Sequence, residues 1–149
     1  MSVVEVHDPI ERSRICDGVL GDLSDWFGFE DVNAAYVRDV AELPTFAIED
    51  DAFLALKVHN PRAAELYVIG VRRDRHRRGL GTALLDAAEA YLRARDVEYL
   101  QVKTLGPSYP DEGYERTRRF YETRGFVPLE EIHGLGDTDN PCLLMVKRL

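Results

Sequence analysis

Hydrophobic and polar positions follow a helical period in the first third of the chain, after one short strand. Residues 2–6 alternate as a strand does, and the stretch up to about Leu23 predicts a loose helix that Gly18 and Gly21 interrupt. Apolar residues at helical spacing predict a second helix over 31–43, which the following proline ends. The pattern therefore predicts a strand followed by two helices in the N-terminal part of the chain.

The period then changes to that of strands. Runs at 45–48 and 52–58 form a predicted hairpin around Asp50-Asp51, and a third strand covers 65–71. The later elements are a helix over 81–95, a strand over 97–105, a helix over 114–124 closed by Gly125, and strands over 126–133 and 141–147. This order predicts an α/β (α+β) fold with a mixed, mostly antiparallel sheet, helices on its faces and one parallel crossover through the helix at 81–95.

Length and composition favour one domain, 1–149, with a cytoplasmic location. A chain of 149 residues has the size of an ordinary domain, and it contains no apolar run near the roughly 20 residues needed to cross a bilayer. Its N-terminus lacks the pattern of a secretory signal, and two cysteines are too few for a disulfide framework. We therefore expect no membrane association. The net charge of −8 argues against nucleic acid as a partner.

A basic cluster stands apart from this acidic background. Five arginines fall between positions 72 and 78, directly before Gly79-Leu80-Gly81. A dinucleotide fingerprint would need glycine or alanine where Leu84 stands, and the P-loop pattern is absent. What remains is a strand, two glycines and a helix start, whose unpaired N–H groups and partial positive charge bind anions. The alternative is a solvated connection in which the glycines only make a turn.

In this context the segment resembles the GNAT superfamily of acyl-CoA-dependent N-acetyltransferases. That family carries Gln or Arg, two variable residues, Gly, one variable residue and Gly or Ala between its fourth strand and the next helix. Here the glycines are Gly79 and Gly81, and His76 replaces the first residue. The resemblance covers nearly the whole chain and implies a single GNAT domain, with about seven strands, about four helices and a splay between strands 4 and 5.

The resemblance also implies where acetyl-CoA, the co-substrate, would bind. Backbone groups of the fourth strand at Ile69, Gly70 and Val71 would hold the pantetheine arm, and the turn would hold the pyrophosphate. The turn residues implied are His76, Arg77, Arg78, Gly79, Leu80, Gly81 and Thr82. Because the contacts are made by backbone N–H groups, the change to His76 puts little of this in doubt. Relatives often add an asparagine for CoA, and none occurs between Val97 and Tyr121.

Two residues are implied as catalytic. Tyr121, which follows Phe120 in a helix ending at Gly125, occupies the position of the family's tyrosine that faces the CoA sulfur, and a phenol can donate a proton to a thiolate. Its alternative is an ordinary core aromatic. Glu65, 14 residues before Gly79, matches the glutamate that acts as general base in some members. It either points to solvent on an edge or sits in a cleft with a raised pKa.

The expected partner is an amine acceptor that attacks the thioester directly. Making a lysine-like amine neutral at pH 7 costs about 4.6 kcal/mol, against about 1 kcal/mol for an α-amine, so a base matters more for the first. The loop residues Ser108 and Tyr109 are candidates for acceptor contacts. So are Trp26, Phe27 and Phe29, for which core packing is the commoner explanation.

Other chemistries and partners find less support. The four histidines lack metal-ligand spacing, so no metal is expected, and no serine or cysteine stands in a nucleophile motif. Family members are often homodimers, which makes a homodimer possible here. Two alternatives stay open: a non-catalytic CoA-binding or regulatory module on the same fold, and a polyanion-binding protein that uses the arginines at 72–78.

Overall fold

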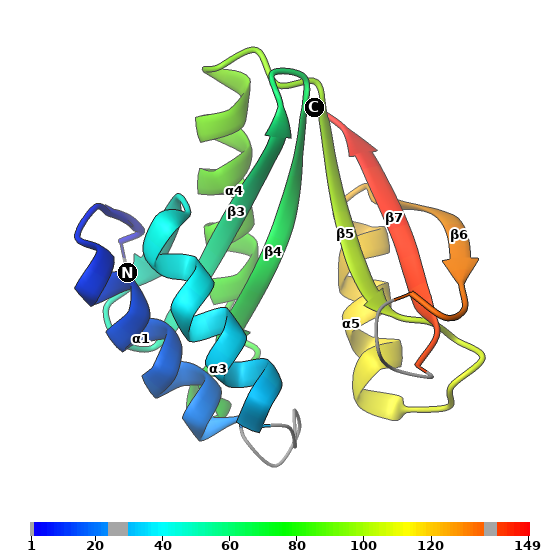
Figure 1. The fold of residues 1–149 in the computed structure, drawn as a ribbon, viewed down its shortest axis with the longest axis horizontal. Coiled ribbons are helices and arrows are strands. Elements are labelled where there is room, and N and C mark those ends of the chain that lie inside the picture. The colour runs from blue at the N-terminus through cyan, green and yellow to red at the C-terminus, as the bar shows by residue number, and fades with distance from the viewer. Residues whose placement is uncertain (1, 24–29, 136–139) are drawn as a thin grey trace. The chain divides into compact units, whose positions relative to one another are not determined.

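The predicted order of helices and strands is confirmed in the computed structural model, which describes residues 2–23, 30–135 and 140–149 (Figure 1). The strands are β1 (Val4–Val6), β2 (Thr45–Ile48), β3 (Ala52–Asn60), β4 (Ala63–Val71), β5 (Tyr99–Leu105), β6 (Val127–Ile132) and β7 (Cys142–Arg148). The helices within the described residues are α1 (Pro9–Asp22), α3 (Glu30–Asp39), α4 (Leu80–Arg93) and α5 (Glu112–Thr123), with short 3₁₀ turns at Val40–Glu42 and Arg73–Arg75.

The strands form one sheet in the order β1-β2-β3-β4-β5-β7-β6. All pairs are antiparallel except β4–β5, the parallel pair that the crossover through α4 predicts. The expected splay between β4 and β5 stays a prediction. The chain divides into two compact units, residues 1–57 with 66–95 and residues 58–65 with 96–149.

The first unit packs helices on both faces of its strands. In Figure 1, α1 and α3 lie in front of the strands and α4 lies behind them. On the α1 side, Val19 and Leu20 join Phe53 in one buried cluster. On the α4 side, Tyr91 meets Phe46 of β2 edge to face at 5.4 Å between ring centroids. The apolar period of each helix is thus used to cover the sheet.

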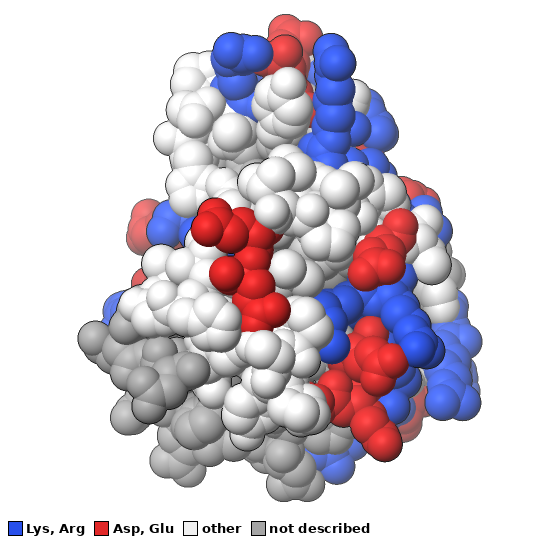
Figure 2. All heavy atoms as spheres, turned by 90° about the vertical axis from the view of Figure 1, so that its right-hand side faces the viewer, with Lys and Arg blue, Asp and Glu red and all other residues white. Residues whose placement is uncertain are grey.

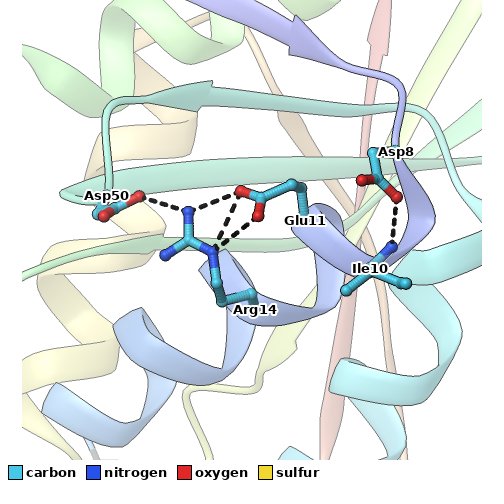
Figure 3. Close-up of polar contacts among 5 residues, drawn as sticks. All are labelled: Asp8, Ile10, Glu11, Arg14 and Asp50. Atoms are coloured by element: carbon cyan, nitrogen blue, oxygen red, sulfur yellow. Dashed lines mark hydrogen bonds and ion pairs between the residues drawn. The ribbon is translucent and has the colours of Figure 1, made fainter.

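Helix α1 is regular over 14 residues, and the prediction of a loose, interrupted helix was wrong. The side chain of Asp8 accepts a hydrogen bond from the Ile10 N–H at 3.0 Å, and proline occupies the first helical position. Arg14 then bridges Glu11 (2.7 Å) and Asp50 in the β2–β3 turn (3.0 Å), as Figure 3 shows. Capping, ion pairing and tertiary packing therefore outweigh the low helix propensity of Gly18 and Gly21.

Replacing Arg14 by methionine should lower the melting temperature more at pH 7 than at about pH 2.5. Hydrogen bonds from Arg14 lower the pKa of both Glu11 and Asp50 below their usual values. A carboxyl whose pKa is depressed in the folded state stabilises the fold above its unfolded pKa, about 4, and this stabilisation is lost as the pH falls through the folded value. Thermal unfolding at the two pH values measures the effect. An equal loss of melting temperature at the two pH values would contradict this prediction.

Gly70 of β4 is required by close packing. A Cβ built there would lie 2.9 Å from Val19 Cγ1 and 3.1 Å from Phe53 Cε1. Gly70→Ala should therefore destabilise the fold by about 1–3 kcal/mol in urea unfolding. In α1, a Cβ at Gly21 would meet nothing within 4 Å, so Gly21→Ala is the matched control and should stabilise by up to about 1 kcal/mol. Equal effects of the two substitutions would rule out the packing explanation.

The second unit contains β5, β7, β6 and α5. Strand β5 pairs with β7 from Tyr99 opposite Arg148 to Leu105 opposite Cys142, and β6 pairs with β7 through a bulge between Pro128 and Glu130. Alternate residues of β5 and β7 are buried. Cys142 is half-buried.

The face drawn in Figure 2 carries acidic and basic side chains interspersed with uncharged ones. Within α5, Glu115 and Arg119 form an ion pair of 2.7 Å. Charges of both signs thus lie side by side on this face.

Candidate functional site

The turn between β4 and α4 has the backbone shape that its glycines predict. Arg77 and Gly79 both adopt left-handed conformations, with φ of 64° and 75°. The first helical hydrogen bond of α4 runs from the Ala83 N–H to the Gly79 carbonyl at 3.0 Å. The N–H groups of Leu80, Gly81 and Thr82 precede this bond, so they have no acceptor within the helix. These N–H groups and the positive end of the helix dipole are suited to bind an anion.

The buried side chain of Leu80 fixes this helix start, since it is 6% exposed. Gly79, in contrast, faces open space: a Cβ built on it would have no heavy atom within 4 Å apart from its chain neighbours. The need for glycine at this position is thus conformational, because L side chains avoid positive φ. The space beside it is accessible to a ligand.

The arginine cluster is partly structural. The Arg72 Nε donates to the Asp50 carbonyl at 2.7 Å, and Arg75 lies 3.4 Å from Asp51, so both anchor the turn to the β2–β3 hairpin. Arg77 and Arg78 are exposed, and neither side chain has a partner within the described residues. Only part of the cluster is thus available to bind phosphate, and this weakens the polyanion-binding alternative.

His76, the residue that departs from the family pattern, points back toward β4. Its Nε2 lies 2.7 Å from the Val71 carbonyl oxygen. The imidazole therefore braces the turn, and an anion at this turn would meet backbone groups. Ile69 and Val71 are half-buried, whereas Gly70 is buried against α1 and β3.

Tyr121 occupies a fixed position at the end of α5. The Phe126 N–H donates to the Tyr121 carbonyl (3.0 Å) and the Gly125 N–H to the Glu122 carbonyl (3.1 Å), the two bonds of a Schellman motif. Gly125 has a φ of 96°, as its predicted capping position requires. The apolar contact of this motif is the Tyr121–Phe126 ring pair, with centroids 5.5 Å apart. Tyr121 is 4% exposed, so it belongs to the core of its unit independently of any catalytic role.

Glu65 lies in a cluster with an imidazole and an ammonium group from neighbouring strands. Its Oε1 is 2.7 Å from Nε2 of His59 on β3 and 3.3 Å from Nζ of Lys103 on β5. The Glu65 side chain is only 8% exposed, against 32% for His59 and 42% for Lys103. Glu65 therefore does not point freely into solvent, one of the two expectations from the sequence. Burial of this carboxylate is compensated by the two partners.

Cys142 of β7 lies near the same cluster. Burial raises the pKa of its thiol, the Glu65 charge adds to this, and Lys103 opposes it. Burial also raises the pKa of Cys16, to about 12. Both cysteines are therefore thiols at neutral pH, which fits the expectation that neither acts as a nucleophile.

A shallow apolar hollow of about 300 Å³ adjoins this cluster along the strands. It is lined by Ala63, Ala64, Tyr99, Gln101, Leu129, Leu144 and Val146. Ala63 lies two residues before Glu65 on β4, so their side chains share one face of the strand, and Leu144 lies opposite Lys103 in the β5–β7 register. An apolar group of a ligand could be bound here beside ionisable side chains.

Sequence reasoning missed His59 and Lys103. The signal for His59 was its position: it and Glu65 flank the short turn between β3 and β4, so a hairpin brings the two strands together.

Of the acceptor candidates, Ser108 hydrogen-bonds to Glu131, and Tyr109 is 49% exposed. Trp26, Phe27 and Phe29 lie outside the described residues.

The described part of the chain holds no cluster of three or more His, Cys, Asp or Glu side chains that could bind a metal ion. Within residues 2–23, 30–135 and 140–149, none of the helices combines the length and apolar composition that crossing a bilayer requires.

Comparison with known proteins identifies the family. The sequence profile of the acetyltransferase (GNAT) family matches residues 19–126, so the chain belongs to this family. A mycothiol acetyltransferase from Beutenbergia cavernae is 40% identical over 83 residues, which make up 54% of this chain and 26% of that protein. The chain spans about a quarter of the length of the curated relatives it matches.

Solved structures share the fold. A GNAT-family protein from Desulfovibrio desulfuricans is 19% identical with a TM-score of 0.81, over 99% of this chain and 98% of that one. An aminoglycoside 6′-N-acetyltransferase crystallised with coenzyme A is 17% identical with a TM-score of 0.75, over 99% and 97% of the two chains. At these identities the likeness is one of fold.

Proposed function

We propose that this protein is an N-acetyltransferase that transfers the acetyl group of acetyl-CoA to a primary amine by direct attack. The observation that carries the proposal is the left-handed Gly79 at the start of α4, in a chain whose family is that of GNAT acetyltransferases. The turn supplies unpaired N–H groups and open space, and a solved structure of the same fold is a complex with coenzyme A. Acetyl-CoA would supply the activated thioester.

In this proposal the backbone N–H groups of Leu80, Gly81 and Thr82 bind the pyrophosphate, while Arg77 and Arg78 lie near enough in sequence to pair with its charge. His76 supports the turn through Val71, and the backbone of β4 at Ile69 to Val71 holds the pantetheine arm. Tyr121 donates a proton to the departing thiolate, and the Glu65 cluster receives the proton of the amine.

The acceptor is proposed only by class, as a primary amine on a small molecule, peptide or protein. The net charge of −8 favours the approach of cationic amines. The relatives named above are acetyltransferases of mycothiol and of aminoglycosides, so a small polyfunctional amine is a reasonable first probe.

Calorimetry with acetyl-CoA and a thiol-release assay test the proposal. The assay uses spermidine, kanamycin A, Nα-acetyllysinamide and trialanine as acceptors. We expect saturable binding of acetyl-CoA and release of CoA that depends on one of the amines. Absence of binding at millimolar acetyl-CoA would overturn the proposal. Binding without transfer to any amine would favour a non-catalytic CoA-binding module.

Tyr121→Phe should lower kcat by about 10- to 100-fold and leave the affinity for acetyl-CoA within about twofold, because only the hydroxyl is removed. The Tyr121–Phe126 contact that closes α5 is kept by phenylalanine, so the melting temperature should change little. Phe120→Leu, at the neighbouring half-buried position whose ring meets Tyr121 edge to face at 5.6 Å, is the control for ring packing and should retain turnover. Unchanged turnover in the Tyr121 variant would remove this residue from the mechanism.

A further inference from the structure

His59 is more accessible than the Glu65 carboxylate that it contacts. The exposed fraction of its side chain is 32%, four times that of Glu65 at 8%. Both His59 Nε2 and Lys103 Nζ contact the same carboxylate oxygen, Oε1, at 2.7 and 3.3 Å. Protonation of this oxygen would disrupt two charge-assisted hydrogen bonds at a buried site. The carboxylate is therefore better suited to hold His59 in place than to receive a proton itself.

The chemistry of the pair determines which nitrogen of His59 is basic. An ionised carboxylate only accepts hydrogen bonds, and the ammonium of Lys103 only donates them. In the contact with Glu65, Nε2 must therefore carry a proton, and in the neutral ring this leaves the lone pair on Nδ1. Nδ1 has no hydrogen-bond partner among the described residues. A buried carboxylate, an oriented imidazole and an open ring nitrogen form the arrangement of a general base and its orienting group.

We propose that His59 is the general base of acetyl transfer, and that Glu65 and Lys103 are positioning residues. This inference rests on the acyl-transfer function proposed above. The amine nitrogen forms a bond to the acetyl carbon while the C–S bond of the thioester breaks. The amine proton passes to Nδ1 of His59, and the proton for the thiolate comes from Tyr121. The resulting imidazolium is stabilised by the Glu65 carboxylate and returns its proton to water.

Among the described residues, the titratable groups of the cluster around His59 come from three other strands. Glu65 comes from β4, Lys103 from β5, and Cys142 of β7 lies within electrostatic range of both. Lys103 repels the imidazolium, whereas the closer Glu65 attracts it. The thiol of Cys142 is uncharged at neutral pH, so it contributes no opposing charge.

The first test needs no acceptor. Long-range ¹H–¹⁵N NMR of the full chain at pH 8 reports which ring nitrogen of each histidine is protonated. We expect the Nε2–H form for His59 in the wild-type protein and a mixture of both tautomers in Glu65→Gln, because an amide can donate as well as accept. Protons on both nitrogens, or a dominant Nδ1–H form in the wild type, would overturn the proposal.

The second test is kinetic, with Nα-acetyllysinamide and trialanine as probes. His59→Ala should lower kcat by about 10²- to 10⁴-fold on either probe that the wild type acetylates, with unchanged affinity for acetyl-CoA. Added imidazole should restore part of this activity, which a purely structural role would not allow. His133→Ala is the matched control, since His133 also pairs with a glutamate, Glu131, at 3.5 Å in the same unit. It should keep full activity.

The outcomes separate the two proposals. A wild-type protein that binds acetyl-CoA and acetylates a probe, with His59→Ala equally active, overturns the role of His59 and leaves the proposed function intact. A loss of activity that imidazole does not restore also counts against a base at this position. A wild-type protein that neither binds acetyl-CoA nor releases CoA overturns the proposed function, and the base proposal with it.

Discussion

Glu65→Gln is expected to lower kcat for acetyl transfer by about 10²- to 10⁴-fold while the affinity for acetyl-CoA stays within about twofold. Glutamine keeps the size of the side chain but removes the negative charge that both His59 and Lys103 contact. The imidazole would lose the acceptor that selects its Nε2–H form, and the ammonium would keep only a neutral partner. Steady-state kinetics and calorimetry separate the effects on turnover and on binding.

The control for this variant is a second buried glutamate in the same chain. Glu89 of α4 is 4% exposed and pairs with Arg93 at 3.0 Å, a situation similar to that of Glu65 in burial and charge. Glu89→Gln should lower the melting temperature and leave kcat unchanged. If both variants lost turnover equally, the effect would be one of stability, and if neither did, Glu65 would have no part in catalysis.

Gly79→Val is expected to weaken the binding of acetyl-CoA by about 5- to 30-fold. A non-glycine residue in the left-handed region costs about 1–2 kcal/mol, which lowers the population of the turn conformation that presents its N–H groups. Because the space around Gly79 is open, the side chain adds this strain without a clash inside the protein. A β-branched residue beside a bound pyrophosphate would add to the loss.

Gly134 is the matched control for Gly79. It has a φ of 77°, against 75° for Gly79, and a Cβ there would also meet nothing within 4 Å. Gly134→Val should therefore lower stability by a similar amount and leave the affinity for acetyl-CoA unchanged. Calorimetry on the two variants decides the matter: equal affinities would show that the β4–α4 turn does not bind the phosphates.

Local sequence signals were sufficient for most of the fold. The runs at 45–48 and 52–58 formed the predicted hairpin, and Gly125 closed α5 at the expected residue, because turn and cap preferences depend on neighbouring residues alone. Helix α1 was misjudged since its stabilising partners, Asp50 and the sheet beneath, are distant in sequence. The close packing of Gly70 against Val19 likewise could not be predicted from the sequence, because the two residues are far apart in the chain.

The candidate site likewise combines features that the sequence predicts with features that only the folded structure shows. The sequence alone determined the β4–α4 turn, because Gly79 and the helix start that follows it specify a backbone conformation locally. It also determined the family. Only the tertiary structure decided that Arg72 and Arg75 anchor the turn, and that Glu65 is buried against His59 and Lys103. Ion pairs between strands depend on register and on burial, and no local pattern encodes either of them.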